Sequence, residues 1–158
     1  MTTEANSLSL TEFWGEPISV YTEEDALRDG TLVEVTDTAR EAGFSCRYFL
    51  TRAAWEDFAE WTPQDEKAKG GAGQSVRGRL WDVVWMSKFA SSRANVERGY
   101  GYFKFSRVPR PGRGRQRVVT AKIVFGGTFN GEPSATVMLP NDPSSAARQR
   151  PLQRAVRW

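Results

Sequence analysis

Apolar and polar residues alternate with a period of two in three segments near the C-terminus, at 102–108, 118–125 and 135–139. This period is typical of strands that bury one face. Short polar connections join the segments, which therefore predict a three-stranded antiparallel meander. Lys104 and Lys122 fall on the opposite, outer face. The residues predicted to face the core are Phe103, Phe105, Val119, Ala121, Ile123, Phe125, Ala135, Val137 and Leu139.

A helical repeat precedes these strands, at about 76–92. Apolar residues recur there on two adjacent stripes, which together form a wide apolar arc. We therefore expect a central, Trp-rich helix that is buried against the inner face of the sheet. The first stripe contains Leu80, Val83, Val84 and Ser87, and the second contains Trp81, Trp85 and Phe89.

The first half of the chain predicts shorter elements. Thr22 and Asp25 have the spacing of a capping box at the start of a helix. Cys46 lies on the apolar face of a predicted strand, so we expect it to fill space in the core. The predicted strands lie at 18–21, 31–36 and 44–50, and the predicted helices at 23–29, at 37–43 and from Thr51 to about Pro63.

The predicted fold class is thus α+β, with a three-stranded antiparallel meander packed on a central Trp-rich helix and an acidic N-terminal half of short helices and strands. Residues 1–10 are small and polar, and we expect them to be disordered. A single domain is expected at 11–142, with a flexible loop at 63–75 where charge and glycine are mixed. The segment 143–158 is basic and is predicted to form a tail.

The chemical groups available to the chain exclude several kinds of active site. Among its 158 residues there is no histidine and there is one cysteine. This excludes a histidine base, a Ser-His or Cys-His pair, an internal disulfide and a cysteine-rich metal site. Adjacent acids such as Glu23 and Glu24 are better explained as charges at a helix start. We therefore expect no enzyme, no cofactor and no metal. A lone cysteine without a signal-like or membrane-spanning segment favours a cytoplasmic protein.

The net charge of +3 hides two halves of opposite sign. Residues 1–75 contain 6 basic and 15 acidic residues, whereas 76–158 contain 16 basic and 4 acidic residues. Such asymmetry can indicate a face for nucleic acid or for an acidic partner. The alternative is that the two halves fold against each other, so that their fields largely cancel.

An arginine cluster concentrates the positive charge of the second half. Proline and glycine residues interleave with the arginines, which predicts an exposed hairpin tip between two strands. Guanidinium groups suit bidentate contacts with phosphate or carboxylate, so we expect this tip to bind an anionic partner. The alternative is a solvated loop that prevents aggregation at the sheet edge. The cluster consists of Arg107, Arg110, Arg113, Arg115 and Arg117.

The segment 98–105, RGYGYFKF, matches the octamer of RNA-recognition motifs with two conservative departures. In that octamer the third and fifth residues stack on bases, which predicts exposed rings at Tyr100 and Tyr102. The order of the neighbouring elements argues against the complete motif, because a helix precedes the octamer here and strands follow it. The alternative is ordinary cross-strand aromatic packing.

Several segments together resemble a family of small uncharacterised proteins that bacterial plasmids, integrative elements and phages encode. The resemblance spans about 18–142 and rests on ISVYTEEDALRDGTLVEVTDTAREAGF, RLWDVVWM, FSRVPR and VTAKIVFGGTFNGEPSATVMLPND. The family pattern carries no known active site, so it transfers no functional residue. The resemblance implies a context, because small accessory proteins of mobile elements often inhibit host defence by stoichiometric binding.

Two hypotheses of function follow. The first is a non-enzymatic inhibitor of a host nucleic-acid-directed defence system, with CRISPR surveillance complexes favoured over restriction enzymes as the target. The second is a nucleic-acid-binding accessory protein of plasmid or phage maintenance. The expected partners are therefore a host defence complex or nucleic acid, and no membrane. The candidate binding residues are Tyr100, Tyr102, Lys104, Arg107, Arg110, Arg113, Arg115, Arg117 and Lys122.

Overall fold

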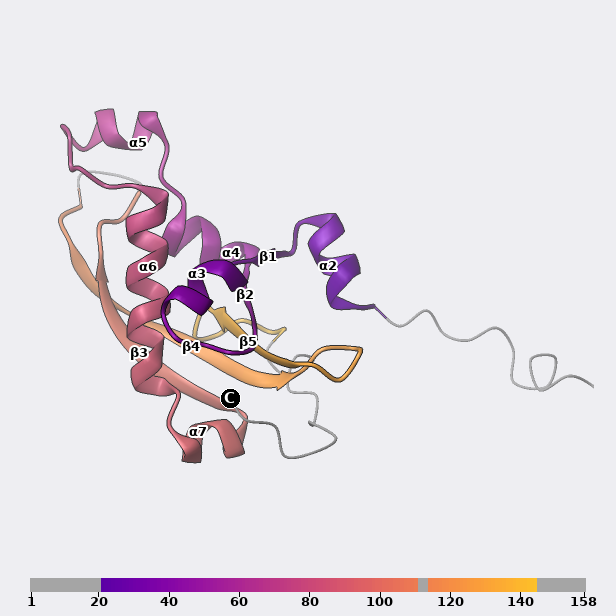
Figure 1. Ribbon diagram of the computed structural model, residues 1–158. Helices are drawn as coiled ribbons and strands as arrows, with labels where there is room; N and C mark the ends of the chain where they lie inside the picture. The colour runs from indigo at the N-terminus through magenta and orange to yellow at the C-terminus, as the bar shows by residue number, and fades with distance from the viewer. Residues whose placement is uncertain (1–20, 111–113, 145–158) are drawn as a thin grey trace, which may run out of the picture.

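The computed structural model describes residues 21–110 and 114–144, which form a mixed sheet and a layer of helices (Figure 1). Within these residues the sheet has five strands in the order β1-β2-β5-β4-β3. Strand β2 pairs with β5 in parallel, and the other neighbours are antiparallel. The strands are β1 (Leu32–Glu34), β2 (Arg47–Thr51), β3 (Tyr100–Arg107), β4 (Arg117–Gly127) and β5 (Pro133–Met138).

Helix α2 precedes β1, and the other helices lie between β1 and β2 and between β2 and β3. The α-helices are α2 (Glu23–Asp29), α3 (Thr36–Glu41), α4 (Arg52–Ala54), α5 (Pro63–Ala68), α6 (Val76–Ser87) and α7 (Arg93–Arg98), and there is a π-helical turn η1 (Trp55–Ala59) and a 3-10 turn η2 (Lys88–Ala90). The predicted α+β class is confirmed. The sheet is larger than the predicted three strands, because β1 and β2 extend it beyond β5.

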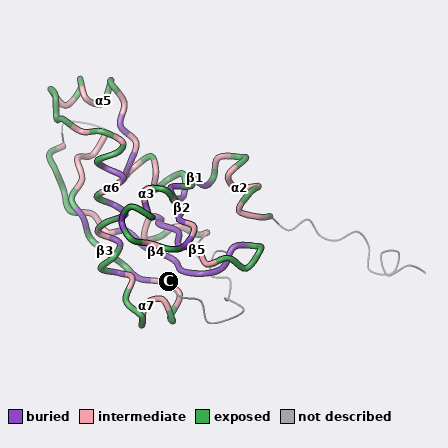
Figure 2. Tube along the Cα trace, viewed as in Figure 1, coloured by how far each residue is buried: buried purple, intermediate pink, exposed green. Residues whose placement is uncertain are grey.

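The main core lies between the sheet and the layer that contains α6, η1 and α3. Figure 1 shows α6 lying across β3, and the buried stretches in Figure 2 follow the strands. We call the sheet face toward α6 the inner face and the opposite one the outer face. Phe103 and Phe105 are buried on the inner face, as the alternation predicted. Strand β2 is buried on both faces, because Phe49 packs with α2 residues in a second cluster.

One of the two apolar stripes of α6 is buried in the core, whereas the other contacts the core only through Trp81. The first stripe is buried, and the Tyr48 hydroxyl donates a hydrogen bond of 2.7 Å to Ser87 Oγ within it. The second was expected to be buried as well, and this expectation is wrong for Trp85 and Phe89. The side chain of Trp85 is 45% exposed and that of Phe89 is 75% exposed. The reason is that α6 belongs to an outer layer, so only one side of the helix can contact the sheet.

The segment 63–75, which was predicted to be a loop, begins with helix α5. Pro63 was expected near a helix end, but it occupies the first turn of α5, where its missing N–H costs nothing. Thr62 and Asp65 form a capping box there, as Thr22 and Asp25 do in α2. The predicted helix at 37–43 begins one residue earlier, at Thr36. The predictions for 1–10, 18–20 and 145–158 lie outside the described residues.

Glu66 ties the end of α5 to the segment that leads into α6. The indole of Trp61 donates a hydrogen bond of 2.7 Å to Glu66 Oε2, and the backbone N–H of Gly73 donates one of 2.6 Å to Oε1. The pKa of the Glu66 carboxyl lies below its usual range, because the backbone N–H of Gly73 and then the indole of Trp61 bind the ionised form. Its charge therefore stabilises the folded state.

We expect Glu66→Gln to lower the melting temperature at pH 7 and to have a smaller effect under acidic conditions. The folded-state pKa is depressed, so the stabilisation is present above the unfolded-state pKa and is lost as the pH falls through the folded-state value. Thermal melts of both proteins between pH 7 and pH 2 test this. Equal differences in melting temperature across that range would contradict the role of the charge.

Candidate functional site

The predicted binding residues lie on two different faces of the β3–β4 hairpin. Residues of β3 and β4 that pair directly share a face, and successive residues alternate between faces. Tyr102 pairs with Lys122, whereas Arg107 pairs with Arg117. Tyr100, Tyr102, Lys104 and Lys122 therefore belong to the outer face, and Arg107 points toward the helical layer. The structure does not bring the tyrosines and the hairpin arginines together.

The outer face of β3 and β4 carries a cluster of rings and cations, which we call the outer-face cluster. The rings of Tyr100 and Tyr102 lie 6.0 Å apart, at an angle of 81°. The Lys122 ammonium lies 5.0 Å from the ring centroid of Tyr100 and 5.9 Å from that of Tyr102. Both distances are within the range of cation–π attraction. The cluster consists of Arg98, Tyr100, Tyr102, Lys104 and Lys122.

The two tyrosines differ in accessibility, although both were predicted to be exposed. The side chain of Tyr102 is 50% exposed. Tyr100 is only half-buried, and its ring is occupied by cations, since Arg98 Cζ lies 4.6 Å from its centroid in addition to Lys122. Lys104 is exposed, whereas Lys122 is 9% exposed.

Arg98 was not among the predicted binding residues. It ends α7, and Gly99 then adopts φ 90°, which turns the chain into β3. Arg98 Nη2 donates a hydrogen bond of 2.7 Å to Asn95 Oδ1, and Nε donates one of 3.4 Å to the carbonyl of Tyr100. These contacts hold the guanidinium over the Tyr100 ring. The sequence did contain a signal for Arg98, because it occupies the basic first position of the octamer at 98–105.

All the charged side chains in the chain segment that carries this cluster are basic. Residues 98–127 include no aspartate or glutamate. Across the part of the chain that the structure describes, neither Lys104 nor Lys122 forms an ion pair. Neither charge is therefore neutralised by a carboxylate of the described residues.

Arg107 and Arg110 form ion pairs within the protein, so they are not the free guanidinium groups that were expected at the tip. Arg107 Nη2 lies 2.7 Å from Asp57 Oδ1. Arg110 forms ion pairs with Glu60 and, at 3.0 Å, with Asp65. All three carboxylates come from the acidic first half of the chain. The two halves therefore fold against each other here, which was the alternative explanation of the charge asymmetry.

The remaining arginines of the predicted tip are Arg113, Arg115 and Arg117. Arg115 and Arg117 are exposed. Arg117 shares the face of Arg107 through their pairing, so it does not join the tyrosines. Arg113 lies outside the described residues.

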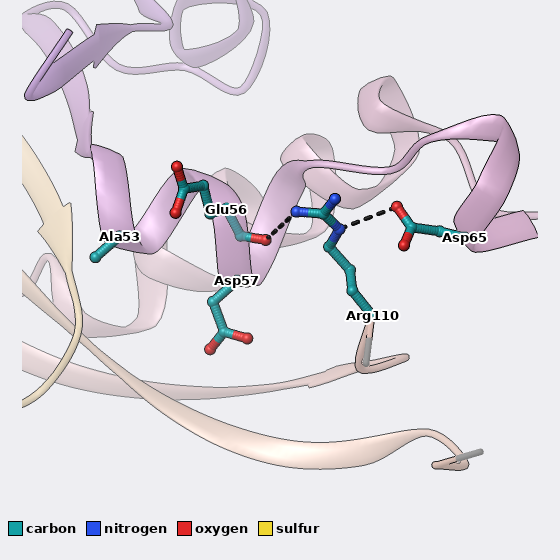
Figure 3. A pocket seen from close by; sticks show the side chains of 5 residues that line it. All are labelled: Ala53, Glu56, Asp57, Asp65 and Arg110. Atoms are coloured by element: carbon teal, nitrogen blue, oxygen red, sulfur yellow. Dashed lines mark hydrogen bonds and ion pairs between the residues drawn. The ribbon is translucent and has the colours of Figure 1, made fainter. Parts of the chain in front are cut away.

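A shallow pocket of about 480 Å³ surrounds Arg110 (Figure 3). Arg110 Nη1 donates a hydrogen bond of 3.3 Å to the carbonyl of Glu56, and Nε contacts the Asp65 carboxylate. The pKa of Asp65 lies below its usual range: burial acts to raise it, but hydrogen bonds from Thr62 and Arg110 outweigh that effect. The polar groups that line this pocket therefore hold the hairpin against η1 and α5.

Other candidate chemistry in the described residues is limited. No group of three or more histidine, cysteine, aspartate or glutamate side chains there could hold a metal ion. Burial raises the pKa of the Cys46 thiol to about 11, so the thiolate is scarce at neutral pH. This agrees with the predicted role of Cys46 in the core. None of the described helices is both long enough and apolar enough to cross a membrane.

Comparison with known proteins adds no assignment. No protein-family model, no curated protein and no solved structure matches the chain. The resemblance to proteins of mobile elements therefore stays a prediction that rests on the segments quoted above.

Proposed function

We propose that the protein binds nucleic acid through the outer-face cluster. The observation that carries this proposal is the exposed ring of Tyr102 beside Lys122 and Lys104, on a surface whose chain segment contains no acidic residue. Aromatic rings stack on bases of any sequence, and lysine and arginine contact phosphates. An accessory role in plasmid or phage maintenance rests on the resemblance alone, and the expected cytoplasmic location rests on the lone cysteine.

The arrangement also supports a division between binding and structural arginines. Arg98 stands in the cluster, whereas Arg107 and Arg110 hold the hairpin against η1 and α5. A polyanion would therefore meet Arg98, Lys104 and Lys122 first.

We expect the protein to bind a fluorescent 12-nucleotide strand with an affinity that falls as salt rises. Lys104→Glu and Lys122→Met should each weaken binding by roughly tenfold and should reduce the slope of log affinity against log salt by about 0.7 to 1, because each removes one phosphate contact. Fluorescence anisotropy at several salt concentrations measures both quantities.

Lys67→Glu is the matched control, since Lys67 is exposed on α5 and lies outside the cluster. It should leave the salt slope near that of the wild-type protein. If both cluster variants bind as the Lys67 variant does, or if the wild-type protein binds no oligonucleotide, the proposal is wrong.

We propose a second function, stoichiometric inhibition of a host defence complex, on a separate observation. Trp85 and Phe89 are large exposed aromatic side chains on α6 and η2, and Trp81 stacks on Trp85 with centroids 5.6 Å apart. Aromatic residues are enriched at protein–protein interfaces. This patch lies on the helical layer, away from the outer face. It replaces the arginine tip as the suggested contact with a CRISPR or restriction complex.

Trp85→Ala combined with Phe89→Ala should abolish such inhibition and leave oligonucleotide affinity unchanged. Phage plating efficiency on a CRISPR-protected host, and on a restricting host, measures the inhibition. Lys104→Glu should leave plating efficiency unchanged under this hypothesis. The hypothesis is rejected if the wild-type protein protects phage in neither host, or if the aromatic variant protects as well as the wild type.

A further inference from the structure

We infer that the two tyrosines of the outer-face cluster have different roles, and that the ligand is a single strand with an unpaired base. Tyr102 would stack on that base, whereas Tyr100 would position Arg98 and Lys122 for the adjacent phosphates. This inference rests on the proposed nucleic-acid function and specifies its ligand class.

The accessible ring is that of Tyr102. Half of its side chain is exposed, and its nearest aromatic neighbour meets it at 81°, edge to face, rather than stacking on it. A ring in this arrangement keeps a face available for a planar ligand. Stacking on a base commonly changes affinity by about tenfold or more.

The ring of Tyr100 is already in use. Arg98 Cζ lies 4.6 Å and Lys122 Nζ 5.0 Å from its centroid. A base that approached this ring would compete with the two cations for it. The ring instead fixes where the cations lie, so Tyr100 is a positioning residue.

Arg98 is prepared for a phosphate by its other contacts. Asn95 Oδ1 accepts from Nη2 and the Tyr100 carbonyl accepts from Nε, which leaves Nη1 outside these two hydrogen bonds. A planar guanidinium fixed in this way loses little freedom when it binds an oxygen anion. The ammonium of Lys122 lies 5.0 Å from the ring centroid of Tyr100 and 5.9 Å from that of Tyr102, so it stands near a phosphate that flanks a base on Tyr102.

The position of Tyr102 on a strand of a sheet disfavours a duplex as the ligand. Bases of a duplex stack on one another, and their faces become accessible only when a nucleotide is unpaired and unstacked. A ring projecting from a sheet can therefore stack on a single strand without the cost of opening base pairs. A duplex would offer this site its phosphates alone.

The test compares three 12-nucleotide probes of equal backbone charge per strand: an ordinary single strand, an abasic single strand and a duplex. Anisotropy competition at fixed salt measures the affinity for each. We expect the wild-type protein to bind the ordinary strand about tenfold or more tightly than the abasic strand. Tyr102→Ala should bring this ratio close to one, and Tyr102→Phe should restore it.

Tyr100→Leu should act differently, because it releases the cations. Both affinities should fall and the salt slope should decrease, while the ratio between ordinary and abasic strands stays near the wild-type value. Tyr100→Phe keeps the ring and should behave as the wild type. If circular dichroism shows that Tyr100→Leu does not fold, Arg98→Ala tests the same expectation, because Arg98 is the exposed partner of the Tyr100 ring.

Two outcomes separate the inference from the proposed function. If ordinary and abasic strands bind equally well, or if Tyr100→Leu and Tyr102→Ala have the same effect on the ratio, the division of roles is wrong while nucleic-acid binding stands. If a duplex binds more tightly than the single strand, the ligand class is wrong. If none of the three probes binds, the proposed function itself is rejected.

Discussion

The backbone pairing of β3 with β4 is the constraint on which the position of every candidate residue depends. Eight residue pairs join the strands, from Tyr100 with Val124 to Arg107 with Arg117. Because side chains alternate along both strands, this register assigns each ring and each cation to one face. The two tyrosines and the two lysines lie outward, whereas Phe103, Phe105 and Arg107 lie inward, with Arg107 beside Asp57. A shift of the register by one residue would exchange these roles.

Electrostatics between the two halves of the chain then determine which cations remain available. The acidic first half supplies Asp57, Glu60 and Asp65 to the loop end of the hairpin, where Arg107 and Arg110 pair with them. These pairs are partly buried, so solvent screens them less than it screens pairs on the open surface.

Gly101 determines the packing at the other end of β3. A Cβ at this position would lie 2.7 Å from the carbonyl oxygen of Ala90, so the missing side chain lets the strand lie against η2.

The sequence predicted the local features that depend on neighbouring residues. The capping box of α2, the buried residues of β3 and the inner stripe of α6 follow from spacing alone. It did not predict features that depend on distant residues. The parallel pairing of β2 with β5 joins residues more than eighty positions apart, and the ion pairs of Arg110 join residues 45 and 50 positions apart. The Thr62–Pro63 start of α5 was present as a local signal and was missed because the glycines that follow favoured a loop.

The place of β5 in the sheet has a consequence for how the chain reaches its folded state. This strand lies between β2 and β4, although it comes last of the five along the chain. During synthesis both of its neighbours exist before it does, and each then has an unpaired edge that could join another chain. Completion of the sheet must wait until residues 133–138 have left the ribosome, so nascent chains are most prone to mispairing just before that moment.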